Sequence, residues 1–165
     1  MKNYTYQTLV PDHAELWRKL RLQGVRDFPL GFLVTPQEAE SADNERCRDI
    51  LSSGTYRGVF VGQELVGFCG YHRQTLSRIR HRAEVGPFYV APPHQGKGAA
   101  SQMMQGVIQD AEADGLAQLE LFVDTENSRA IAFYERHGFT RCATHPDTVR
   151  VDGQSRDDYF MVRRL

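Results

Sequence analysis

One segment of the sequence combines residues that could bind a phosphorylated ligand. Gln95-Gly-Lys-Gly-Ala-Ala100 is a run of small residues that follows an apolar stretch and two prolines and leads into a helical pattern from Gly98 to Ala113. Small residues let backbone N–H groups come close to a ligand, and the unpaired N–H groups at a helix start favour an anion. The first turn of the expected helix contains no acidic side chain. The segment therefore predicts a phosphate-binding loop.

Two nucleotide-binding motifs can be compared with this loop. A Walker loop is excluded because Ala91 stands where that motif needs glycine and Gly98 stands where it needs Ser or Thr. The Rossmann fingerprint fits better, but Ser101 replaces its third glycine and residues 92–94 separate strand from loop. A dinucleotide-dependent oxidoreductase is therefore a weak alternative.

The length and composition fit one soluble domain. The chain has 165 residues, a formal net charge of −1 and three widely spaced cysteines, Cys47, Cys69 and Cys142. This charge gives no general attraction to nucleic acid or to an anionic membrane. No apolar run reaches the roughly 18 residues of a membrane span, and the N-terminus does not resemble a signal peptide. We expect a single domain over residues 1–165, buried reduced thiols, no metal site and a cytoplasmic location.

Hydrophobic periodicity and turn residues predict the elements that position the loop. The expected order is βααβββαβαββ, a mixed and mostly antiparallel pattern. The expected strands are 4–9, 56–61, 65–74, 83–90, 118–123, 139–145 and 155–162, and the expected helices begin at 11, 35, 98 and 128.

The two N-terminal helices have distinct signals. In the first, Leu16, Trp17, Leu20 and Gly24 are expected to share one face. The second begins with a capping box at Thr35 and is expected to run to about Leu51, with its acidic residues exposed. These acidic residues are Glu38, Glu40, Asp43 and Glu45. His94 is expected to be an exposed loop residue, and Met103 and Met104 are expected to fill the core.

Two blocks of the sequence resemble the GNAT superfamily of N-acetyltransferases. The loop Gln95–Ala100 is similar to the family signature that holds the pyrophosphate of acetyl-coenzyme A, and Asn127–Phe139 is similar to the second family block. Asp158-Tyr-Phe-Met161 resembles the last strand of many members. The resemblance implies an α/β (α+β) fold with a mixed, mostly antiparallel sheet of six to seven strands flanked by helices.

The resemblance also implies roles in acetyl transfer to an amine. An alkylamine is mostly protonated at neutral pH, so a base must remove a proton from it. Glu84 resembles the position where one branch of the family carries its catalytic glutamate, and Glu120 and Asp124 are reserve candidates. The alternative is that Glu84 is an ordinary carboxylate paired with Arg80 or Arg82.

Further residues are implied as contacts to acetyl-CoA. The Phe88 N–H resembles the family's oxyanion contact, and Tyr134 resembles the usual proton donor to the departing thiolate. Pro87 cannot continue a regular ladder, so we expect an irregularity near Gly86 that frees backbone groups for the ligand. The full set of expected cofactor contacts is Phe88, Tyr89, Val90, Gln95, Gly96, Lys97, Gly98, Ala99, Ala100, Asn127 and Tyr134.

The sequence thus predicts an enzyme that transfers acetyl from acetyl-CoA to a primary amine by direct attack in a ternary complex. A covalent route through Cys69 or Cys142 is weak, because the histidine three residues after each would point to the opposite face of a strand. A non-catalytic acyl-CoA-binding protein remains the alternative. The acceptor is expected to be a small-molecule or peptide amine, with no nucleic acid or membrane partner, and the protein a monomer or homodimer.

Overall fold

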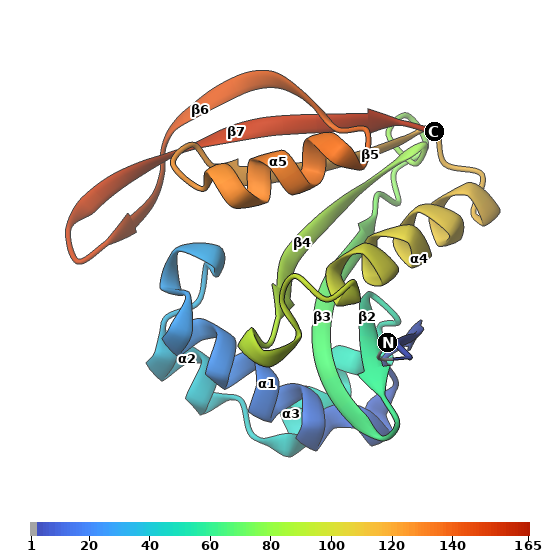
Figure 1. Cartoon of the computed structure of the whole chain (residues 1–165), viewed down its shortest axis with the longest axis vertical. Helices are drawn as coiled ribbons and strands as arrows, with labels where there is room; N and C mark the ends of the chain where they lie inside the picture. Colours follow the sequence, from blue (N-terminus) through green and yellow to red (C-terminus); the bar gives the residue numbers. More distant parts are fainter. Residues whose placement is uncertain (1–2) are drawn as a thin grey trace. The chain divides into compact units, whose positions relative to one another are not determined.

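The computed structural model describes residues 3–165 and contains a mixed sheet of seven strands flanked by helices. The strand order is β1-β2-β3-β4-β5-β7-β6, and the pairing of β4 with β5 is parallel. The strands are β1 Thr5–Thr8, β2 Tyr56–Val61, β3 Glu64–Arg73, β4 Arg82–Val90, β5 Gln118–Asp124, β6 Thr140–Val151 and β7 Gln154–Arg164. The α-helices are α1 Ala14–Asp27, α2 Pro36–Ser41, α3 Asn44–Ser52, α4 Ala99–Ala113 and α5 Ser128–Arg136. The predicted fold class is confirmed (Figure 1).

The chain divides into two units, which are described separately. The first contains residues 3–71 and Pro87–Val107, and the second contains His72–Gly86 and Ile108–Leu165. The boundary in β4 falls between Gly86 and Pro87, the pair for which an irregularity is predicted.

The first unit has an aromatic core under α1. Trp17 is fully buried, with its ring centroid 4.9 Å from that of Tyr56 and 6.0 Å from that of Phe68. Leu20 and Gly24 are buried on the same helix, as predicted. Leu16 is 40% exposed, so its placement on this face was wrong. It adjoins Trp17 in the sequence, and one helical residue turns the side chain by about 100°.

The predicted single helix from Thr35 to Leu51 is two helices. The capping box at Thr35 is present, with Glu38 N donating to Thr35 Oγ1 and Thr35 N donating to Glu38. Asp43 then starts α3, because its carboxylate accepts a hydrogen bond from Arg46 N at 2.8 Å. This second cap was overlooked, since Asp43 was assigned to a solvated face. The four acidic residues of this region are exposed, as predicted.

Helix α4 approaches β1 closely where it carries glycine. A Cβ at Gly106 would lie 2.4 Å from the ring of Tyr6, so any larger residue would displace this ring. Met103 and Met104 on the same helix are fully buried, as predicted.

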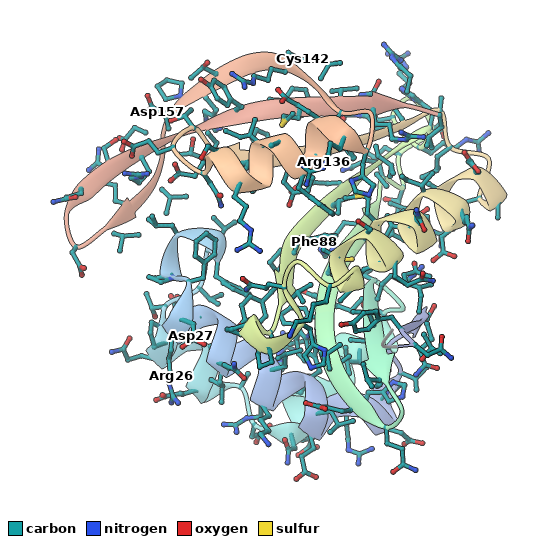
Figure 2. All side chains as sticks on the ribbon, in the orientation of Figure 1. Arg26, Asp27, Phe88, Arg136, Cys142 and Asp157 are labelled. Atoms are coloured by element: carbon teal, nitrogen blue, oxygen red, sulfur yellow. The ribbon has the colours of Figure 1, made fainter. Side chains whose placement is uncertain are left out.

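The second unit is built on the β6–β7 hairpin, which turns at Asp152-Gly153 with positive φ at both residues. Both strands are longer than predicted. Figure 1 shows α5 beside this hairpin, and Arg163 on β7 donates a hydrogen bond to the carbonyl of His137 just after α5. Cys142 on β6 is exposed, so the expectation of buried thiols holds only for Cys47 and Cys69 (Figure 2).

No helix among residues 3–165 is long and apolar enough to cross a membrane.

Candidate functional site

The β4–α4 connection has the backbone geometry of an anion-binding loop. After a 3₁₀ turn at Pro92–His94, Gly96 has φ 69 and Gly98 has φ 96, values that residues with a side chain rarely adopt. Within the described chain, no atom lies within 4 Å of where a Cβ would stand at either glycine. The backbone is thus open at both glycines, and the first turn of α4 has no acidic residue, which favours an anion.

The polar side chains of this loop hold the loop itself. Gln95 Nε2 donates to the Val90 carbonyl at 2.9 Å, and Lys97 Nζ donates to the Pro93 carbonyl at 2.7 Å. Ala99 is buried and Ala100 is half-buried, so they anchor the start of α4. The loop is therefore fixed by its own side chains.

His94 does not behave as predicted. It is 4% exposed, and its Nδ1 lies 3.3 Å from the hydroxyl of Tyr4. The two rings meet edge to face with centroids 5.9 Å apart. The expectation of an exposed histidine was wrong because Tyr4, 90 residues away in the sequence, covers it.

The middle of β4 is irregular, as predicted. Gly86 has φ 151, and the carbonyl of Gly86 lies 3.1 Å from Nε2 of His72. The parallel pairing of β4 with β5 covers three residue pairs and ends at Glu84 and Glu120. A strand that leaves its ladder here can offer backbone groups to a ligand.

Phe88 and Tyr89 follow this irregularity in the first unit. Phe88 is half-buried (Figure 2). Tyr89 is 5% exposed, and its ring packs against Phe32 and Phe68 with centroids 5.9 and 6.2 Å away. Burial, followed by the nearby carboxylate of Asp27, raises the pKa of Tyr89 to about 12. The side chain of Tyr89 is thus a core residue, and only its backbone is suited to contact a ligand.

Three carboxylates were candidates for the base, and one of them is Glu120. It is 4% exposed, accepts a hydrogen bond from Arg82 Nη1 at 2.7 Å and another from Gln118 Nε2 at 3.1 Å. Both contacts engage the Glu120 carboxylate, so its oxygens are already occupied within the described structure.

Asp124 is the second candidate, and its carboxylate is also bound by an arginine. Both of its oxygens accept hydrogen bonds from Arg156, each at 2.8 Å. Burial alone would raise the pKa of Asp124, but the Arg156 hydrogen bonds and the backbone N–H of Glu126 outweigh it and hold the pKa below its usual range. Asp124 therefore stays ionised and paired at neutral pH.

Glu84 is the third candidate and differs from both. It lies opposite Glu120 in the β4–β5 register and is half-buried. Arg82 pairs with Glu120, so the alternative in which Arg82 holds Glu84 was wrong. Among residues 3–165, no hydrogen bond or ion pair engages the Glu84 carboxylate. Glu84 is thus the carboxylate of the three that is available for proton transfer.

The second sequence block places Asn127 and Tyr134 on α5. Asn127 caps the helix, with its Oδ1 accepting a hydrogen bond from Ala130 N at 3.1 Å. Tyr134 is 8% exposed, and its ring meets Phe133 and Phe139 edge to face at 5.4 and 5.8 Å. The helix ends at Arg136, and Gly138 two residues beyond has φ 85. Glu84, Asn127 and Tyr134 belong to the second unit, whereas Phe88 to Ala100 belong to the first.

The structure also reveals a carboxylate that was not singled out from the sequence. Asp158 on β7 is 8% exposed, and burial, followed by the neighbouring charge of Asp124, raises its pKa. A sequence signal could have identified it: Asp158, Phe160 and Val162 are spaced two residues apart, so Asp158 is expected on the same strand face as two apolar residues. Within residues 3–165, no group of three potential ligands that could hold a metal ion is present.

Comparisons with known proteins relate the chain to acetyltransferases. The chain is 29% identical over 150 residues to a mycothiol acetyltransferase of Propionibacterium freudenreichii, covering 81% of the chain and 47% of that protein. It is 35% identical over 82 residues to an uncharacterized N-acetyltransferase of Mycobacterium bovis, covering 50% of the chain and 51% of that protein. The chain thus spans about half the length of these curated relatives.

Solved structures share the fold. A ribosomal-protein-alanine N-acetyltransferase from Brucella melitensis aligns with a TM-score of 0.85 at 18% identity, covering 98% of the chain and 99% of that protein. An acetyltransferase from Salmonella typhimurium, solved with its cofactor acetyl-CoA, aligns with a TM-score of 0.84 at 17% identity over 98% of the chain and 94% of that protein. A sequence profile of the acetyltransferase (GNAT) family matches residues 17–139, about three quarters of the chain. The chain belongs to the GNAT family of acetyltransferases.

Proposed function

We propose that this protein transfers the acetyl group of acetyl-CoA to a primary amine by direct attack in a ternary complex. The observation that carries the proposal is the β4–α4 loop, in which Gly96 and Gly98 adopt positive φ before a helix start without acidic residues. Family membership makes acetyl-CoA the donor best suited to this loop.

The proposed donor site uses backbone more than side chains. The N–H groups of Gly96 to Ala100 would bind the pyrophosphate, with Lys97 adding a positive charge. The backbone of Phe88 to Val90 and the side chain of Asn127 would contact the pantetheine arm. When bound, acetyl-CoA supplies a thioester carbonyl that an amine can attack.

Glu84 is the proposed base. Since an alkylamine has a pKa of about 10, it must lose a proton before its nitrogen can attack. Glu84 would accept that proton directly or through one water. Its half-buried position and its lack of a cationic partner in the described structure support this role.

Two further groups would complete the reaction. The Phe88 N–H would stabilise the oxyanion that forms as the nitrogen bonds to the carbonyl carbon. Tyr134 would then donate its phenolic proton to the thiolate as the carbon–sulfur bond breaks. The nitrogen then gives its second proton to solvent, which leaves the neutral amide, while Glu84 passes its proton to solvent and Tyr134 takes one back.

The surroundings of the reaction are also part of the proposal. The buried free thiols of Cys47 and Cys69 support a reducing compartment such as the cytoplasm. The acceptor is proposed to be a small-molecule or peptide amine, bound by a monomer or homodimer.

A thiol-release assay with a panel of amines tests the proposal. We expect amine-dependent release of CoA that falls strongly in Glu84→Gln and Tyr134→Phe, while both variants still bind acetyl-CoA. If acetyl-CoA binds but no amine accelerates CoA release, the protein is a non-catalytic acyl-CoA-binding member of the family and the proposal fails.

A further inference from the structure

A buried carboxylate without a partner lies on β7. Asp158 is 8% exposed, and among the described residues no hydrogen bond or ion pair reaches its oxygens. Among the described residues, the side-chain atoms that are fully buried and lack a hydrogen-bond partner are Trp17 Nε1, Tyr89 Oη and Arg163 Nε, so the Asp158 oxygens still reach solvent. A carboxylate that is unpaired and accessible can accept a cationic ligand as its partner.

Strand register places aromatic rings beside this carboxylate. Asp158 lies opposite Asp124 on β5 and opposite His145 on β6, while Phe160 lies opposite Phe122. Directly opposite residues share a sheet face, as do residues two apart on one strand. The Phe122 ring centroid is 5.2 Å from that of Phe160 and 5.8 Å from that of His145. Asp158 therefore shares its face with a cluster of three rings.

The neighbouring charges leave Asp158 available. Arg156 is the nearby cation, and it is engaged by both oxygens of Asp124 and by Glu126. The other titratable neighbours are Asp157 and His145. Phe122 is 43% exposed, so the cluster is open to a ligand at this ring. A carboxylate that shares a sheet face with aromatic rings offers the two kinds of group that bind an organic ammonium.

The distance along the sheet sets the size of the ligand. Glu84 is in register with Glu120, and Asp158 is in register with Asp124, four residues further along β5. At about 3.3 Å per residue this separation is roughly 13 Å along the strands, and because β4 and β7 lie two strands apart it is also roughly 10 Å across the sheet, about 16 Å between the two backbones in all. An amine held at Glu84 and an ammonium held at Asp158 would thus be separated by a chain on the order of 10 Å.

We propose that Asp158, Phe122 and Phe160 form a subsite for a second cationic group of the acceptor, so that long diamines are preferred over monoamines of the same length. This inference rests on the proposed acetyl transfer. The reacting nitrogen loses its proton at Glu84, whereas the distal nitrogen stays protonated and binds the Asp158 carboxylate.

Matched acceptors test the subsite. The value of kcat/KM is measured for 1,8-diaminooctane and for 8-aminooctan-1-ol, which carries a hydroxyl in place of the second ammonium. 1,3-Diaminopropane is too short to reach from Glu84 to Asp158. We expect wild type to prefer the long diamine over both other acceptors.

Two subsite variants and one control variant are compared by their preference for the diamine over the amino alcohol. In Asp158→Asn the ratio of kcat/KM for the diamine over the amino alcohol should fall about tenfold, the size of one lost buried charge contact. In Phe122→Leu, which changes an exposed ring, it should fall about threefold. Asp152→Asn removes the same charge from the exposed hairpin turn and should leave the ratio unchanged.

The outcomes separate this inference from the proposed function. If amines are acetylated but the ratio stays within about twofold of wild type in Asp158→Asn and Phe122→Leu, the subsite is wrong and the acetyl transfer stands. An equal fall in Asp152→Asn would show a general effect of charge and would also overturn the subsite. If no amine is acetylated, the proposed function itself fails. Thermal unfolding checks that each variant is folded, and Phe122→Leu carries the test if Asp158→Asn is not.

Discussion

Glu84 and Glu120 lie opposite each other on the parallel strands β4 and β5, and Arg82 donates its hydrogen bond to Glu120. The two glutamates thus have different environments, because Arg82 binds Glu120 and not Glu84. Glu120 is held as a buried ion pair, while Glu84 is half-buried beside the irregularity at Gly86. This difference underlies the assignment of Glu84 as the base.

Glu84→Gln should therefore lower the reaction rate, whereas Glu120→Gln should lower the stability of the fold. Glu84→Gln should lower kcat/KM by about 100-fold with little change in the thermal midpoint, because a general base contributes at least that much. Glu120→Gln should lower the free energy of unfolding by about 2 kcal/mol, because it weakens the charged hydrogen bond to Arg82. Initial rates and thermal unfolding measure the two effects. A large rate loss in Glu120→Gln without loss of stability would contradict the assignment.

Gly96→Ala tests the loop through its backbone. Gly96 and Gly115 have φ 69 and φ 71, and a Cβ at either would meet no atom of the described structure within 4 Å. Both alanine variants should lose about 1 kcal/mol of stability from the same backbone strain. Only Gly96→Ala should raise KM for acetyl-CoA, by about tenfold, because a methyl group would occupy the space assigned to pyrophosphate. Equal KM values in the two variants would show that the loop does not bind the donor.

Tyr134→Phe separates catalysis from packing. The ring remains in contact with Phe133 and Phe139, so the thermal midpoint should change little. Loss of the phenolic proton should lower kcat about 100-fold while KM for acetyl-CoA stays within a few-fold of wild type. A variant that keeps the wild-type kcat would leave Tyr134 as a core residue only.

The stability of Asp158→Asn should depend on pH in a defined direction. Burial and the charge of Asp124 raise the pKa of Asp158, so the folded state binds its proton more tightly than the unfolded state does. The wild-type protein therefore loses stability as pH rises from the unfolded pKa through the folded pKa, and the cost is fully present above the folded pKa. Asp158→Asn should be more stable than wild type at pH 7, by about 1 kcal/mol, and the gain should vanish below about pH 4.

Asp124→Asn should show the opposite behaviour. The pKa of Asp124 is held low, so its contribution is present above the unfolded pKa and is lost as pH falls. The variant should be less stable than wild type at pH 7 and similar to it in strong acid. Thermal unfolding of both variants across pH measures the two trends, and trends of the same sign would refute the contrasting environments of these two carboxylates.

Most of the fold could be predicted from the sequence because its signals are local. Alternation and turn residues gave every strand, and the capping residues Thr35 and Asn127 begin helices as expected. The break between α2 and α3 was missed because Asp43 can equally be an exposed acidic residue or a cap, and the local pattern does not distinguish them.

The errors at the site come from long-range contacts. His94 is buried and contacts Tyr4, which is far away in the sequence. Arg82 on β4 donates its hydrogen bond to Glu120 on β5. Among the described residues Asp158 has no ion-pair partner, because Arg156 is bound to Asp124 and Glu126. None of these contacts can be predicted from the spacing of residues along the chain, because each depends on which segments become neighbours in the fold.

Identification of the reaction products tests the central claim most directly. Wild-type protein is incubated with acetyl-CoA and an amine that supports CoA release, and mass spectrometry follows the amine, the CoA and the intact protein. Direct attack assisted by Glu84 predicts equal amounts of free CoA and N-acetylated amine, with no acetyl group on the protein when the amine is left out. Free CoA without acetylated amine, or an acetyl group on Cys69 or Cys142 that later passes to the amine, would contradict it.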